Sequence, residues 1–203
     1  MKALLLIDIQ NDFIPGGSLA VPGGDEIIAM VNELQPRFEL VVATQDWHPP
    51  HHKSFSANHP GKNVFDQIDL NGFTQVLWPV HCVQGTKGAE FSKMLNINKV
   101  EAIFRKGTDI EIDSYSGFYD NGHCKSTALA DYLRGKQATE LYIAGLAADY
   151  CVYYTAKDAI QEGFTAYVIE DAVRAISNEG FDKAKKDISD KGGRITRSTS
   201  IFL

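Results

Sequence analysis

The sequence predicts a three-layer α/β fold, in which helices cover both faces of a six-stranded, mostly parallel sheet. Short apolar runs alternate with segments of helical spacing along the chain. The strand candidates are almost continuously apolar, which is typical of parallel strands buried on both faces. With 203 residues and a hydrophobic content of 44%, the chain can bury one sizeable core. We therefore expect a single domain over residues 1–203.

The order of the expected elements is Rossmann-like. The predicted strands are residues 3–7, 39–45, 100–105, 140–145, 164–171 and 194–202. The predicted helices are residues 25–38, 88–95, 125–136, 148–163 and 179–192. One segment, from Asp46 to about Thr86, shows little regular periodicity and holds all but one of the six histidines. Loops of this length within a compact domain are usually functional, so we expect this segment to contribute to a site.

Composition excludes several classes of protein. The net charge of -6 argues against a nucleic-acid partner. No apolar stretch approaches the roughly 20 residues that a membrane-spanning helix needs, and Asp8 interrupts the apolar N-terminus too early for a signal peptide. Three cysteines do not suggest a disulfide framework. We expect a cytoplasmic protein with free thiols and no membrane partner, and leave open whether it forms a homo-oligomer.

Ionisable side chains follow four of the predicted strands. Asp8 follows the first strand, Asp46 the second and Lys106 the third, and Cys151 comes after residues 140–145 and a short turn. A free cysteine is more often a buried core residue. However, ligands bind outside the carboxyl ends of the strands in an open parallel sheet. The convergence of these four residues at one edge therefore favours a functional site.

This set of residues suits acyl transfer. A cysteine attacks as its thiolate, and both a helix N-terminus and the Lys106 cation are expected to lower its pKa. No histidine follows a strand outside the long segment, so Asp8 is the better candidate for the general base. The backbone amides from Ala147 to Cys151 lie in a turn that enters a helix, where they can form an oxyanion hole.

A second group of residues suits a metal. Asp46 and His48 alternate in an extended stretch, so their side chains can share one face. His81 arrives from the far end of the same segment. One carboxylate and two imidazoles can hold zinc, manganese or iron(II). His51 and His52 are further candidates from spacing alone.

The glycine-rich residues 15–24 match no phosphate-binding motif. We interpret them as a flexible loop over the end of the first strand, where Phe13 and Leu19 would form a pocket wall.

Seven motifs, in order along nearly the whole chain, then indicate a family. The sequence resembles the nicotinamidases (pyrazinamidases) of the isochorismatase-like cysteine hydrolase superfamily. The motifs are LLLIDIQNDF, ATQDWHP, WPVHCVQGTKGAEF, RKGTD, DSYSGF, AGLAADYCVYYTAKDA and VIEDA. The first marks the superfamily, and D-W-H-P together with W-P-x-H-C marks its metal-containing nicotinamidase branch.

The resemblance implies roles for particular residues. It implies a catalytic triad of Asp8, Lys106 and Cys151, and a cis peptide before Ala147 that turns the amides of Ala147 and Cys151 toward the oxyanion. It implies one divalent metal, with zinc expected first, which the ring nitrogen of the substrate also ligates. The metal ligands would be Asp46, His48 and His81, with His52 or Ser54 offered for the additional protein ligand that some members have. The ring would be lined by Phe13, Trp78 and Tyr115.

The activity implied by the resemblance is hydrolysis of nicotinamide to nicotinate and ammonia through a thioester on Cys151, in NAD salvage. Two alternatives remain at this point. One is another amidase of the superfamily, acting on a carbamoyl or ureido substrate. The other is a binding domain that keeps the fold without turnover.

Overall fold

The six-stranded sheet is parallel throughout. The computed structural model describes residues 1–202. Neighbouring strands all pair in parallel, so the expected mostly parallel sheet is confirmed. The order across the sheet is β5 (Val100–Lys106), β2 (Leu40–Asp46), β1 (Lys2–Ile7), β6 (Glu140–Leu146), β7 (Thr165–Arg174) and β8 (Arg194–Thr196).

This order places a crevice beside β1. The chain builds outward from β1 through β2 to β5 and then returns to β6 on the other side of β1. The strand order therefore reverses between β1 and β6, which is where ligands bind in doubly wound sheets. Asp8 follows β1 and Cys151 follows β6 within a few residues, so the topology delivers both to this crevice.

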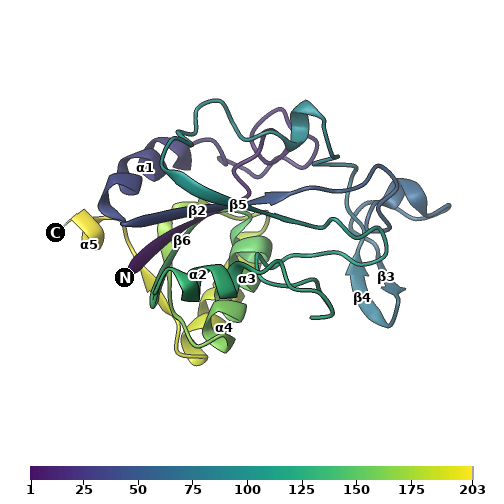
Figure 1. Ribbon diagram of the computed structural model, residues 1–203. Coiled ribbons are helices and arrows are strands. Elements are labelled where there is room, and N and C mark those ends of the chain that lie inside the picture. The colour runs from purple at the N-terminus through teal and green to yellow at the C-terminus, as the bar shows by residue number, and fades with distance from the viewer. Residues whose placement is uncertain (203) are drawn as a thin grey trace.

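Helices cover both faces of the sheet (Figure 1). Leu4 and Leu6 of β1 face the cluster that contains α1 (Ile27–Leu34). Leu5 and Ile7 face the opposite cluster, to which three helices contribute: α2 (Leu129–Gly135), α3 (Tyr153–Gln161) and α4 (Asn178–Asp190). The last helix, α5 (Thr199–Phe202), closes the described chain. In the described part of the chain, no helix is long and apolar enough to cross a membrane.

Three expected elements differ from the structure. The helix predicted over residues 88–95 is wrong: only the 3-10 turn Lys87–Ala89 forms. Beyond it, Phe91 bridges Gln10, and Ser92 N donates to Ile9 O over 3.0 Å, so pairing with the residues just after β1 replaces local helix formation. The helix expected from residue 125 begins only at Leu129, and the strand expected over 194–202 ends at Thr196.

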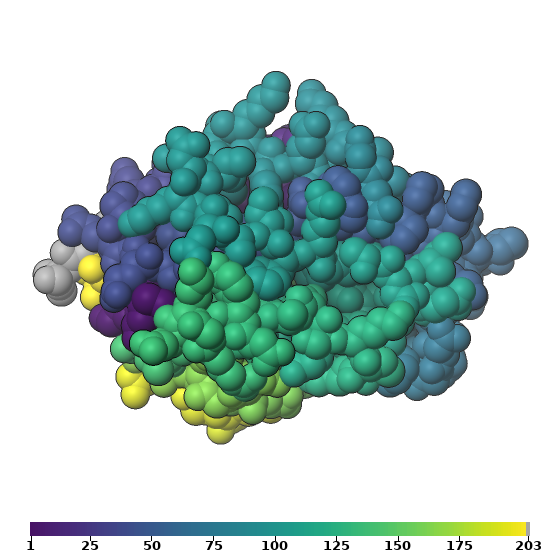
Figure 2. Space-filling model, in the orientation of Figure 1, coloured from purple at the N-terminus to yellow at the C-terminus, as the bar shows by residue number. Residues whose placement is uncertain are grey.

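The long segment after β2 is ordered around a hairpin. Strands β3 (Gln67–Leu70) and β4 (Phe73–Val76) pair antiparallel. Asn71 and Gly72 form the turn with φ of 56° and 85°, as expected for an Asn-Gly hairpin turn. Figure 2 shows this blue segment at one end of the molecule, far from yellow α5. The other short helical turns are Asn11–Phe13, Gln35–Arg37, Ser56–Asn58 and the π-helical turn Ala148–Val152.

Candidate active site

The structure brings Asp8, Lys106 and Cys151 together in the interior. Lys106 Nζ lies 2.9 Å from Asp8 Oδ2 and 3.5 Å from Cys151 Sγ. The same ammonium donates to Asp46 Oδ1 over 2.9 Å and to the carbonyl oxygen of Ser114 over 3.0 Å. Asp8 is fully buried, and Lys106 and Cys151 are nearly so. These contacts fix Lys106 between two carboxylates and the thiol.

Asp8 is oriented by the end of its strand and by a neighbour. Its φ of 48° ends β1 abruptly and turns the chain away from the sheet. Thr44 of β2 donates its hydroxyl to Asp8 Oδ1 over 2.6 Å. One carboxylate oxygen is therefore held by Thr44, and the other faces Lys106.

Burial decides the protonation of the thiol. It raises the pKa of Cys151 well above the ordinary value; the Lys106 charge opposes this shift, and the carboxylates of Asp8 and Asp46 add to it. The expected lowering of the thiol pKa by Lys106 is thus outweighed. Burial also raises the pKa of Asp8, against the opposing charge of Lys106. The resting nucleophile is therefore a thiol that needs a base, and Asp8 is the candidate, because its carboxylate contacts the Lys106 ammonium that also contacts the sulfur.

Asp46, His48 and His81 meet on the other side of Lys106. Asp46 Oδ2 lies 3.1 Å from His48 Nε2 and 3.4 Å from His81 Nε2. All three residues are buried, and their ligand atoms lie within 4.8 Å of one another. Burial opposes ionisation of Asp46, but the charges of His48 and Lys106 lower its pKa well below the ordinary value. The carboxylate is therefore an anion.

The hydrogen bonds of the two imidazoles fit a cation between these three residues. His48 Nδ1 lies 2.9 Å from the carbonyl oxygen of Gly107, and His81 Nδ1 lies 2.8 Å from that of Pro79. A carbonyl only accepts, so both Nδ1 atoms carry the proton. Both Nε2 atoms therefore lie beside Asp46 Oδ2, and once unprotonated each can offer a lone pair to a cation next to that oxygen. A metal ion satisfies all three atoms, and carbonyl-bound histidines are the usual arrangement around metals.

His52 and Ser54 lie next to this group but bond to each other. His52 Nδ1 is 2.7 Å from Ser54 Oγ. His52 Nε2 is buried without a hydrogen-bond partner among the described residues, and it belongs to a second set of candidate ligand atoms with His48 and Asp113. Burial lowers the pKa of His52. His51, the other candidate from spacing, is exposed.

The turn before Cys151 has the backbone that the resemblance implies. The peptide bond between Leu146 and Ala147 is cis. Ala147 precedes the π-helical turn Ala148–Val152, so Cys151 lies near its end and leads into α3. Ala147 and Cys151 both line the same pocket.

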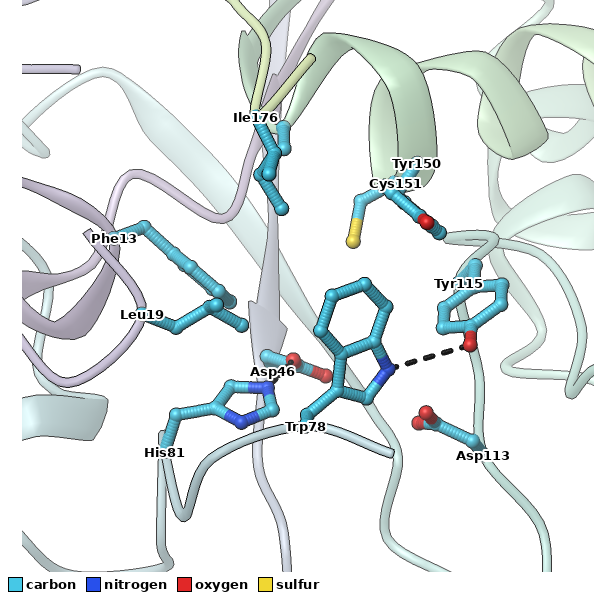
Figure 3. A pocket seen from close by; sticks show the side chains of 11 residues that line it. Phe13, Leu19, Asp46, Trp78, His81, Asp113, Tyr115, Tyr150, Cys151 and Ile176 are labelled. Carbon is cyan, nitrogen blue, oxygen red and sulfur yellow. Dashed lines mark hydrogen bonds and ion pairs between the residues drawn. The ribbon is translucent and has the colours of Figure 1, made fainter. Parts of the chain in front are cut away.

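That pocket joins the two groups (Figure 3). The sulfur of Cys151 points into it from above Trp78, while Asp46 and His81 lie at the opposite end. The four residues predicted to bind substrate all line it: Phe13, Leu19, Trp78 and Tyr115. Trp78 donates its indole N–H to Tyr115 Oη over 3.3 Å, which fixes two of the walls.

Three further lining residues were missed from the sequence: Asp113, Tyr150 and Ile176. Tyr150 is adjacent to Cys151, and Asp113 begins the DSYSGF motif, so both carried a usable signal. Ile176 lies just beyond β7, and no motif in the sequence indicated that it would line the pocket. Its position depends on Asp149, whose carboxylate accepts the backbone N–H of Ile176 over 3.0 Å.

Comparisons with known proteins agree on one family. The model of the isochorismatase domain matches residues 2–200. A curated nicotinamidase of Acinetobacter baylyi is 49% identical over 88% of this chain and 83% of its own. A nicotinamidase of Escherichia coli is 44% identical over 90% of this chain and 87% of its own.

Solved structures agree with these relatives. A nicotinamidase and pyrazinamidase of Acinetobacter baumanii superposes with a TM-score of 0.96 at 46% identity, covering 98% of this chain and 97% of its own. A yeast nicotinamidase bound to the inhibitor nicotinaldehyde superposes with a TM-score of 0.91 at 33% identity, covering 97% of this chain and 100% of its own. A Pyrococcus horikoshii pyrazinamidase in complex with zinc superposes with a TM-score of 0.80 at 39% identity, covering 97% of this chain and 98% of its own.

Proposed function

Because the chain belongs to the isochorismatase family, we propose that it is an amidohydrolase that converts nicotinamide to nicotinate and ammonia. One observation carries this proposal: a single pocket is lined by Cys151 and by the candidate metal ligands Asp46 and His81. The nicotinamidase relatives in Acinetobacter and Escherichia support the substrate. The reaction returns the pyridine ring to NAD synthesis as nicotinate.

Asp8, Cys151 and the turn at Ala147 carry the first half of the reaction. Asp8 takes the proton from Cys151 Sγ, and the thiolate forms a bond to the carboxamide carbon. The carbonyl electron pair moves to oxygen, which the backbone N–H groups of Ala147 and Cys151 are placed to receive. The C–N bond then breaks as Asp8 returns its proton to the nitrogen. Ammonia departs, and the acyl group remains on Cys151 as a thioester.

The second half uses the same base. Asp8 takes a proton from water as the water oxygen attacks the thioester carbonyl. Collapse breaks the C–S bond and the sulfur recovers its proton from Asp8. The product leaves as nicotinic acid and loses the second water proton to solvent to give nicotinate. Lys106 holds Asp8 and the sulfur in position throughout, since its ammonium contacts both.

Asp46, His48 and His81 would hold the divalent metal, and zinc is the first candidate because a relative from Pyrococcus binds it; manganese and iron(II) suit the same ligands. When bound, the metal supplies a Lewis-acidic position for a ring nitrogen. Phe13, Leu19, Trp78 and Tyr115 would then bind the ring and align its carboxamide with Cys151. Pyrazinamide places a ring nitrogen in the same relation to the carboxamide, so we expect it to be a second substrate.

We further propose that the protein works in the cytoplasm, which the unpaired state of Cys82, Cys124 and Cys151 supports.

Ammonia release from nicotinamide by the purified protein tests the function. Cys151→Ala should abolish release, while Cys124→Ala, which alters an exposed thiol, should retain it. Release by wild type from a carbamoyl or ureido compound but not from nicotinamide would favour the other amidases of the superfamily. No release from any amide would favour a binding domain.

A further inference from the structure

The side chain of Gln10 takes the place of a strand beside Asp46. Gln10 is fully buried and lies two residues beyond Asp8, in the turn where Gln10 N donates to Asp8 O over 2.8 Å. Its amide bonds to both main-chain polar groups of Asp46. The N–H of Asp46 donates to Gln10 Oε1 over 2.8 Å, and Gln10 Nε2 donates to the carbonyl oxygen of Asp46 over 2.8 Å.

These bonds are needed because β1 ends before β2 does. The last described pair between the two strands is Leu6 with Ala43, whereas β2 continues to Asp46. On its other side β2 stays paired with β5 up to Asp46 and Lys106. A buried N–H or C=O left without a partner costs free energy. The Gln10 amide supplies one donor and one acceptor, as a residue of a paired strand would.

We propose that Gln10 is a positioning residue for the metal site and joins it to the catalytic carboxylate. The two hydrogen bonds between the Gln10 amide and the main chain of Asp46, here called the Gln10 clamp, fix the position of that residue. They thereby fix its carboxylate, whose Oδ2 faces His48 and His81 and whose Oδ1 faces Lys106. The same short turn carries Asp8. A displacement of Asp46 would therefore disturb the metal ligands and the Lys106 contact together.

Only a primary amide of this length meets these requirements. Glutamate at this position would present a second acceptor to the carbonyl oxygens of Asp46 and Ala89, both of which now accept from Gln10 Nε2. Methionine would leave the N–H and the carbonyl oxygen of Asp46 without these partners, whereas the carbonyl oxygen of Ala89 would keep the bond from Gln45. Asparagine is one methylene shorter.

Gln45 provides a matched control. It is also a buried glutamine, it precedes Asp46 directly, and its Nε2 donates to the same Ala89 carbonyl over 2.9 Å. However, its side chain is not among the hydrogen-bond partners of the Asp46 main chain in the described residues. Replacement of Gln45 therefore removes a comparable buried hydrogen bond and leaves the Gln10 clamp on Asp46 intact.

The inference rests on the proposed metal site, so the experiment tests both separately. The metal-free full-length protein is titrated with zinc against a chromophoric chelator, for wild type, Asp46→Ala, Gln10→Met, Gln10→Glu and Gln45→Met. Urea unfolding of each variant is measured in parallel. A fall in zinc affinity in Asp46→Ala establishes the site itself.

We expect both Gln10 variants to bind zinc about tenfold to a hundredfold more weakly than wild type, the range for residues that orient metal ligands. Gln45→Met should lose much less affinity, even if it lowers stability as much. Saturating zinc should restore most of the activity of the folded Gln10 variants. Two results would overturn the inference. One is a folded Gln10→Glu or Gln10→Met with the zinc affinity of wild type; the other is an equal loss of affinity in Gln45→Met. Equal zinc affinity in wild type and Asp46→Ala would instead remove the proposed metal site, and this inference with it.

Discussion

Lys106 Nζ lies 2.9 Å from Asp46 Oδ1, at the same distance as from Asp8 Oδ2. One buried ammonium thus connects the carboxylate beside the thiol with the carboxylate beside the two imidazoles. Burial opposes the charge, but the two carboxylates raise the pKa of Lys106 well above its ordinary value. The two halves of the site therefore share a permanent cation.

The two carboxylates should have separable roles. Asp8→Asn should keep the metal and lose about 10²- to 10⁴-fold in rate, because an amide cannot accept the thiol proton. Asp46→Asn should instead weaken metal binding, since Asp46 is the carboxylate placed between His48 and His81. Metal content and turnover measured on the same samples check this. Loss of metal in Asp8→Asn with retention in Asp46→Asn would reverse the assignments.

Removing the shared cation should destabilise the fold. Lys106→Met leaves two buried carboxylates without their partner, and breaking a buried ion pair in this way costs about 3–5 kcal/mol. Urea unfolding of the metal-free protein at neutral pH measures the loss, so that metal binding at Asp46 does not contribute. Lys106→Met combined with Asp46→Asn should recover part of it, because one uncompensated charge has been removed. A double variant no more stable than Lys106→Met alone would show that Asp46 is not charged beside Lys106.

The convergence of Asp8, Lys106 and Cys151 was predictable from the sequence because strand topology alone brings them together. Apolar runs identified β1, β2, β5 and β6, and the residues that follow parallel strands must meet at one edge. The proximity of these three residues follows from topology, whereas their assignment as a triad comes from the family resemblance. The hairpin β3–β4 was missed although the Asn71-Gly72 pair signals it.

Other features depend on contacts between distant segments. The helix expected over 88–95 fails because Phe91 pairs with Gln10 instead. The last strand stops early because Ser198 turns to bond Asp171, through its backbone N–H and its hydroxyl. The pKa of Cys151 could not be judged from a neighbouring lysine alone, since burial has the larger effect.

The pH dependence of alkylation should report the raised pKa of Cys151. A raised pKa means that the folded protein holds the thiol proton more tightly, so the thiolate fraction is small at neutral pH. The rate of Cys151 modification by iodoacetamide should therefore still be rising at about pH 8.5, the ordinary thiol pKa. Peptide mapping at each pH separates Cys151 from exposed Cys124. A rate for Cys151 that is already constant from pH 6 to about 8 would indicate a preformed thiolate instead.

Comparison of nicotinamide with benzamide should reveal what the metal does. Benzamide has the same carboxamide but no ring nitrogen, so nothing on its ring can ligate the metal. Small misplacements of a reacting group cost about a hundredfold in rate, and we expect a loss of this order in kcat/KM for benzamide. Removal of the metal should weaken nicotinamide turnover and leave benzamide almost unchanged. Equal kcat/KM values for the two amides in the metal-loaded enzyme would assign the metal to another role.

The central claim is that nicotinamide is hydrolysed through a thioester on Cys151, and acid quenching during the first turnover tests it most directly. Intact-protein mass spectrometry should show a species heavier by the mass of nicotinamide less ammonia. Peptide mapping should place the addition on the peptide that contains Cys151, and the Cys124→Ala protein should give the same result. Cys151→Ala should show neither the adduct nor ammonia. Steady ammonia release by Cys151→Ala at the wild-type rate would contradict the account.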